Sequence, residues 1–144
     1  MMAWCPHHQP YESAPSHLAD VMKLASDATC NELFSMAELP DEEVSLIDAL
    51  LLSVRYANSA CSIAEVKQTL DVLGERVEPR IAQAEGVRDK LDVLTEFLFE
   101  ECGFQGNRDE YYDPRNSYVN KVLERKRGLP ITLSVIYIEV ARRV

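Results

Sequence analysis

Apolar residues recur every three or four positions through the middle of the chain, the spacing of amphipathic helices. One such stretch predicts a helix from about Asp41, its N-cap, to Asn58, with the apolar residues Val44, Ile47, Leu51 and Val54. The next helix opens with a capping box, Ser62 to Glu65, and its apolar face is formed by Ile63, Val66, Leu70, Leu73 and Val77. We expect Gly74 to weaken this helix without stopping it and Pro79 to end or kink it.

A third helix is predicted from about Val87 to Cys102, with Gly103 just past its end and an apolar face of Leu91, Leu94, Phe97 and Leu98. Residues 104–112 then show no period and predict a polar loop. After them, Asp113-Pro114 predicts a helix that ends at Gly128 and carries Arg125, Lys126 and Arg127 in its last turn.

The segment from Pro130 onward permits two readings. Apolar and polar residues alternate from Ile131 to Val135, which favours a strand, but the apolar pattern continues to Arg143, which favours a helix buried on most sides. We expect the helix. It reaches Val144 without a cap, so we also expect this chain to be a truncated part of a longer protein.

These helices must bury their apolar faces against one another, so the fold class is mainly α-helical. We predict a flexible leader over residues 1–27, which contains three prolines, and a helical bundle over 28–103 that includes a short helix from Asn31 to Glu38. Residues 104–144 form a third region.

Charge is spread unevenly along the chain. The net charge is −9, and residues 111–144 hold seven basic against three acidic residues (+4), which leaves −13 on the first 110. We expect the basic end to pair with the acidic body, although an acidic partner is the alternative. The acidic body argues against nucleic acid as a partner, and Arg125-Lys126-Arg127 is a weak signal for it.

No apolar run is long enough to span a bilayer, and the N-terminus lacks the features of a secretory signal. We therefore expect no membrane association. The four cysteines are 25 to 41 residues apart, which fits neither a disulfide framework nor a CxxC metal motif. Reduced thiols in the cytoplasm are the simpler reading.

The block from Tyr111 to Tyr118, followed by Val122 to Tyr137, resembles the signature of the SirB-type invasion-regulator family. Residues 104–107 are similar to the lead-in of that family, and the resemblance covers about residues 91–144. Such proteins carry a transglutaminase-like core and, in full-length members, a tetratricopeptide-type helical region. A related segment occurs in some F-box proteins.

The resemblance implies a papain-like α+β fold in which a central helix packs on a small sheet formed by later residues. Residues 104–144 would then begin this core, with the sheet largely missing from the chain. The superfamily places a nucleophilic cysteine at the start of that helix, where the helix dipole lowers the thiol pKa, and a histidine on a later strand takes the proton.

The matching segment, Leu129 to Ser134, contains no cysteine. Thr132 and Ser134 lack an activating base, because the three histidines lie within the first 17 residues, and we expect their hydroxyls to bond to the helix backbone. We therefore predict a noncatalytic regulatory or protein-interaction protein. The alternative is a cysteine-type hydrolase or acyl transferase whose histidine and acid lie beyond residue 144.

Other candidate sites are weaker. Cys102 follows Glu100 and Glu101 at a helix C-terminus, where the negative field opposes thiolate formation, so we expect a core or boundary cysteine. Cys5, His7 and His8 offer ligand atoms but lack the spacing of a structural zinc site. We expect neither a metal site nor a cofactor.

Polar and aromatic side chains gather where the loop meets the helix start, and the candidate interaction patch is Tyr111, Tyr112, Asp113, Arg115, Asn116 and Tyr118. The structural alternative is an Asp113 cap with Arg115 paired to Glu124 or another acid. The partner would be a protein of unknown identity. A second expected contact is self-association through the exposed final helix, and a helical fragment that needs a partner is a further reading.

Overall fold

The computed structural model describes residues 28–40, 44–57 and 62–144. The predicted leader, its three histidines and Cys5 therefore lie outside the described residues, as does Asp41. Within those residues the chain is mainly α-helical, as predicted. The N-terminal helices are α2 (Ala28–Ala37), α3 (Leu46–Ala57), α4 (Ile63–Ile81) and α5 (Val87–Thr95). Two further α-helices follow the loop, α6 (Val119–Arg125) and α7 (Pro130–Ala141).

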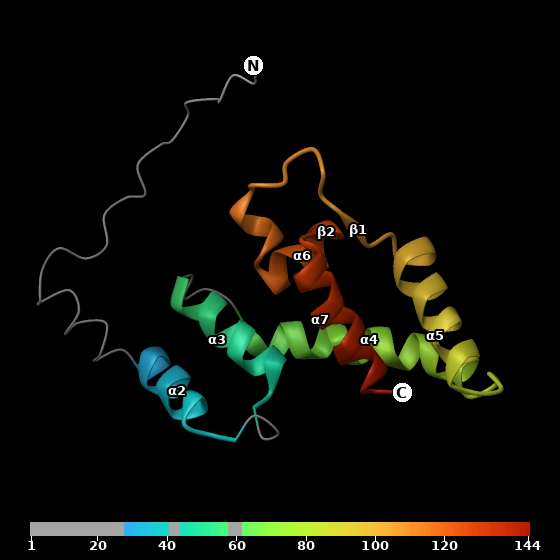
Figure 1. Cartoon of the computed structure of the whole chain (residues 1–144), viewed down its shortest axis with the longest axis horizontal. Coiled ribbons are helices and arrows are strands. Elements are labelled where there is room, and N and C mark those ends of the chain that lie inside the picture. The colour runs from blue at the N-terminus through green and yellow to red at the C-terminus, as the bar shows by residue number, and fades with distance from the viewer. Residues whose placement is uncertain (1–27, 41–43, 58–61) are drawn as a thin grey trace, which may run out of the picture.

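Helix α4 is the centre of the molecule: α5, α6 and α7 all pack on it, and α2 packs on α3 (Figure 1). The Ser62 Oγ accepts a hydrogen bond from the Glu65 N–H at 3.3 Å, which confirms the predicted cap. The helix continues past Pro79 and ends at Ile81. Its predicted apolar face is confirmed, and its buried residues are Val66, Leu70, Leu73, Gly74, Val77 and Ile81.

Two predicted helix boundaries are wrong. Helix α3 begins at Leu46 and not near Asp41, because the Ser45 Oγ accepts the Asp48 N–H at 3.4 Å and so caps the helix at a later position. The helix expected to run unbroken from Val87 to Cys102 changes to a π-helix (η2, Glu96–Glu101) after α5. Gly103 follows with a φ of 73°, the left-handed conformation expected of a glycine that ends a helix.

The loop that follows η2 contains a strand that the sequence pattern did not reveal. Strand β1 (Gln105–Gly106) pairs in parallel with β2 (Arg127–Gly128), and Gln105 lies opposite Arg127. The Asn107 N–H extends the pairing by donating to the Gly128 carbonyl at 3.2 Å. A Cβ on Gly128 would lie 2.7 Å from a Val122 methyl carbon, so glycine is required for this close approach.

The single helix predicted from Asp113 to Gly128 is two elements. A 3₁₀ turn (η3, Pro114–Asn116) comes first, and α6 begins at Val119 with Tyr118 as its N-cap. Lys126 ends α6 in the left-handed conformation (φ 59°), which costs a non-glycine residue roughly 1–2 kcal/mol. Gly128 therefore does not end the helix, as expected from the sequence, but belongs to β2.

Helix α7 confirms the helical reading of the last segment. It is apolar and buries Thr132, Leu133, Val135, Ile136, Glu139 and Val140. It lies across α4 (Figure 1), where Gly74 leaves room for Arg143 at the C-terminal end: a Cβ on Gly74 would lie 2.9 Å from the Arg143 Cβ. Arg143 pairs with Asp71 of α4 at 2.7 Å, so the expected pairing of the basic end with the acidic body occurs here.

Candidate functional site

The first turn of α7 borders an apolar groove of about 590 Å³. Three separate segments form the groove, and its lining residues are Phe99, Gly106, Pro130, Leu133, Ser134, Tyr137 and Ile138. The Phe99 and Tyr137 rings stack with their centroids 6.2 Å apart. The Tyr137 hydroxyl donates to the Leu91 carbonyl at 3.2 Å, which fixes this ring against α5. The groove is therefore a stacked aromatic wall beside an apolar helix, with few polar groups to orient a ligand.

No activated nucleophile is found at this helix start among the described residues. Ile131, which is 72% exposed, and Pro130 occupy the first turn of α7, while Thr132 is buried. The Ser134 Oγ donates to the Pro130 carbonyl at 2.9 Å, the backbone bond predicted for this hydroxyl. The described part of the chain contains no histidine that could accept its proton. Cys102 is a half-buried free thiol packed against the core, as predicted.

The loop between β1 and η3 presents two tyrosines to solvent. Tyr112 is 93% exposed and Tyr111 is 54% exposed, and their rings meet edge to face with centroids 5.3 Å apart. Arg115, also exposed, lies close by on η3. An exposed aromatic pair beside an arginine is the composition found at the anchors of protein interfaces.

Asp113 lies beneath this surface and holds two arginines. Its carboxylate accepts the Arg115 backbone N–H at 2.9 Å, which is the predicted cap, and the Arg115 Nε at 2.9 Å. Arg125 of α6 approaches the same carboxylate at 3.1 Å. The hydrogen bond from the Arg115 side chain, joined by that from its backbone, lowers the pKa of Asp113 to about 2. Arg115 thus pairs with its own cap, whereas Glu124 pairs with Lys121 at 2.8 Å.

Asn116 is fully buried, so this member of the predicted patch does not lie on the surface. Its Nδ2 donates to the carbonyls of Glu110 (2.7 Å) and Tyr111 (3.2 Å), and its Oδ1 accepts from the Asn107 Nδ2 at 3.0 Å. These bonds hold the tyrosine loop on the core. Tyr118 is half-buried against the core and caps α6. The exposed part of the patch is therefore Tyr111, Tyr112 and Arg115.

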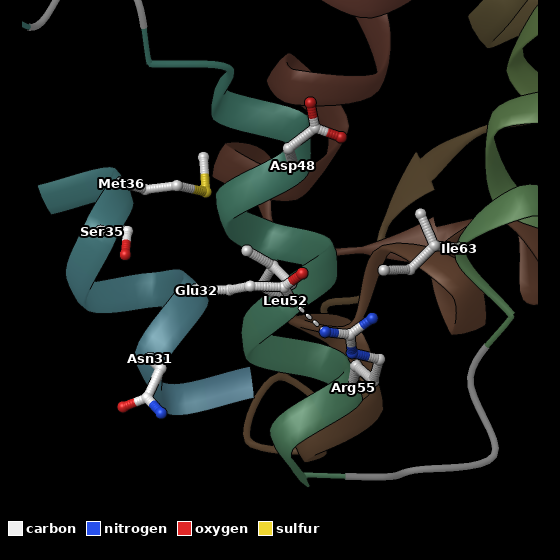
Figure 2. A pocket seen from close by; sticks show the side chains of 8 residues that line it. All are labelled: Asn31, Glu32, Ser35, Met36, Asp48, Leu52, Arg55 and Ile63. Carbon is white, nitrogen blue, oxygen red and sulfur yellow. Dashed lines mark hydrogen bonds and ion pairs between the residues drawn. The ribbon is translucent and has the colours of Figure 1, made fainter. Parts of the chain in front are cut away.

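A second hollow of about 630 Å³ lies between α2 and α3, next to the start of α4. Figure 2 shows Glu32 reaching from α2 to Arg55 on α3, with which it forms an ion pair. Asp48, on the same wall, pairs with Lys67 at 2.7 Å; burial opposes this, but the Lys67 and Ser45 hydrogen bonds lower the pKa of Asp48. Both acids are thus paired with cations above an apolar floor of Met36, Leu52 and Ile63.

Sequence reasoning missed the groove and the Asn107–Asn116 bond. Phe99, Tyr137 and Ile138 come from segments 38 or more residues apart or from positions that local spacing places in a buried helix. The described residues form no cluster of three or more potential metal ligands, and no helix among them is long and apolar enough to cross a membrane.

The family model of the transglutaminase-like superfamily matches residues 64–144. A UPF0162 protein of Xylella fastidiosa is 40% identical over 114 residues, which cover 76% of this chain and 39% of that protein. A UPF0162 protein from a second strain is 58% identical over 55 residues, 38% of this chain and 20% of that protein.

Human F-box only protein 21 is 26% identical over 136 residues, 79% of this chain and 22% of that protein, which confirms the expected similarity to an F-box protein. The chain thus spans less than half the length of these relatives. No solved structure matches the chain significantly.

Proposed function

Because this chain belongs to the transglutaminase-like superfamily, we propose that it acts as a noncatalytic protein-binding part of such a fold. The carrying observation is the start of α7, where the superfamily requires an activated nucleophile. Here the exposed first-turn side chain is Ile131, and the nearest hydroxyl, that of Ser134, is bonded to a backbone carbonyl. An apolar, base-free helix start can bind another surface but cannot carry acyl transfer.

We assign partner binding to Tyr111, Tyr112 and Arg115. Tyrosine buries a large area on binding at a small entropic cost, and Arg115 is held in a fixed direction by Asp113. The buried amide of Asn116 keeps the loop in one conformation before the partner arrives, which reduces the cost of ordering it. The partner is a protein, since an acidic body repels nucleic acid.

The proposed organisation is a leader over 1–27, a helical bundle over 28–103 and the start of the transglutaminase-like core over 104–144. Residues that follow in a longer protein would complete the sheet. A SirB-type regulatory role in the cytoplasm agrees with the sequence block that ends in α7.

Tyr112→Ala and Arg115→Ala test the patch. Captured by photo-crosslinking from extract, the partner should be retained by wild type and lost from both variants, because each removes an exposed anchor. Val87→Ala is the matched control, since Val87 is an apolar residue 76% exposed on α5, outside the patch. Thermal melting should change little in all three variants. Equal loss of binding and of melting temperature would instead assign these residues to the fold.

A hydrolase or acyl transferase is the second candidate, favoured by the exposure of Ser134 at the groove. A fluorophosphonate probe separates the two functions, because it labels only an activated serine. We expect no labelling of Ser134 above that of the Ser134→Ala variant. Stoichiometric labelling of the wild type would establish the enzyme.

A further inference from the structure

Two cations of the described region lie over aromatic rings near each other. The Arg76 guanidinium of α4 lies 5.1 Å from the centroid of the Phe97 ring, and the Lys126 Nζ lies 4.3 Å from that of Phe104. Neither cation forms an ion pair with a described residue. Arg80, one turn further along α4, pairs with Glu101, and Arg125, adjacent to Lys126, pairs with Asp113.

Lys126 is held in place by its backbone as well as by the ring. Its N–H donates to the Val122 carbonyl at 2.8 Å and its carbonyl accepts from the Gln105 N–H at 2.9 Å. Burial and the charge of Arg76 lower the pKa of Lys126, and the groups that act on it include the Cys102 thiol but no carboxylate of the described residues.

Three features are unfavourable for folding alone. Lysine occupies a left-handed position where glycine or asparagine is ordinarily preferred, its amine is half-buried, and a second cation faces it without an acid between them. Strain and like charge kept together at one place are typical of a binding site. An anion placed between the two cations would relieve both the repulsion and the missing ion pairs.

We propose that Arg76 and Lys126 form a binding site for a phosphoryl group. The arginine fork can hold two phosphate oxygens while the lysine supplies a point charge, and together the two positive charges match a dianion. The aromatic rings leave the outward side of each cation open to the ligand. The attraction is local, because the chain as a whole carries −9 and would repel a free anion elsewhere. This inference stands independently of the protein-binding function proposed above.

The test is a nuclear magnetic resonance titration of the chain with inorganic phosphate near neutral pH at constant ionic strength. Saturable amide shifts should centre on Arg76, Phe104 and Lys126. Arg76→Gln and Lys126→Gly should each weaken phosphate binding about tenfold or more, since each removes one charge-assisted contact. Arg88→Gln is the control, because it removes the same charge from an exposed arginine on α5 that forms no ion pair within the described residues.

Lys126→Gly carries a second readout. Glycine suits the left-handed conformation, so this variant should melt at or above the wild-type temperature while it binds phosphate less tightly. If it fails to fold, Arg76→Gln alone decides the question, because Arg76 is exposed. Shifts that do not saturate, or affinities equal in Arg76→Gln and Arg88→Gln, would overturn the site.

The source of the phosphoryl group is distinguished by a second titration with a neutral peptide that carries one phosphoserine. Tighter binding of the peptide than of inorganic phosphate assigns the ligand to a phosphorylated protein. Equal binding assigns it to a small phosphorylated molecule. Both results support the site, and binding of neither ligand refutes it.

Discussion

Asn116 offers the sharpest test of how the tyrosine loop is held. Its side chain forms three hydrogen bonds, to Asn107, Glu110 and Tyr111, and is fully buried. Each bond contributes about 1 kcal/mol net, and removal of the amide leaves the buried Asn107 donor unsatisfied. Asn116→Ala should therefore lower the free energy of unfolding by about 3 kcal/mol. For a chain of this length, that corresponds to a fall in melting temperature of roughly 10 °C.

The assay is urea unfolding followed by circular dichroism, with Asn120→Ala as the matched control. Asn120 lies half-buried on α6, and its Oδ1 has no hydrogen-bond partner within the described residues. Its replacement by alanine should change stability by about 0.5 kcal/mol or less. The Asn107→Ala and Asn116→Ala pair should couple by about 1 kcal/mol in a double-mutant cycle, because the two amides bond to each other.

Cleavage by chymotrypsin after Tyr111 and Tyr112 should also accelerate in Asn116→Ala, since the loop loses its anchors while the helices remain. The reasoning fails if Asn116→Ala costs no more than Asn120→Ala. It also fails if the effects of Asn107→Ala and Asn116→Ala simply add.

Three further changes test other parts of the structure. Gly128→Ala should destabilise by about 1–3 kcal/mol in thermal melts, because its Cβ would lie 2.7 Å from Val122, and Val122→Ala should partly rescue it. The pKa of Asp113 is lowered to about 2, so its stabilising contribution should be complete above about pH 4 and lost as pH falls through 2. The urea midpoint of Asp113→Asn should lack this acid-dependent fall. Ile131→Gln should reduce any concentration-dependent rise in mass seen by light scattering, and an unchanged rise would exclude self-association through the start of α7.

The helices were predictable because their signals are local. The capping box at Ser62 and the apolar spacing of α4 depend on residues three or four apart, and so does the helical pattern of α7. The start of α3 could be shifted because two capping residues, Asp41 and Ser45, compete within one turn. The π-helix has no sequence signal that we can identify.

The β1–β2 pairing was not predictable because a two-residue strand has no period. Its partners, Gln105 and Arg127, are 22 residues apart. The division of the helix after Asp113 also depends on tertiary contacts. The Asn116 side chain turns back to the loop carbonyls, and the chain then restarts a helix at Val119 with Tyr118 as its cap. A pattern of residues cannot distinguish an amide that caps a helix from one that is buried beneath a loop.

The interaction patch was partly predictable for the same reason. Exposure of Tyr111 and Tyr112 follows from their place in an aperiodic polar segment. Burial of Asn116 does not, because it requires the partner amide of Asn107 and the closure of β2 against η3. The groove beside α7 requires three chain segments at once, so none of its aromatic members carries a local signal.

The tyrosine loop and the groove are connected through the backbone at the start of α7. The Leu129 N–H donates to the Asn116 carbonyl at 3.0 Å, and the Asn107 N–H donates to the Gly128 carbonyl at 3.2 Å. The residues that orient the loop therefore also fix the direction in which α7 begins. Because Pro130 lies next to Leu129 and borders the groove, a displaced loop must also displace one wall of the groove. Asn116→Ala should thus change amide exchange at both places, whereas a loop that moves alone would leave α7 unaffected.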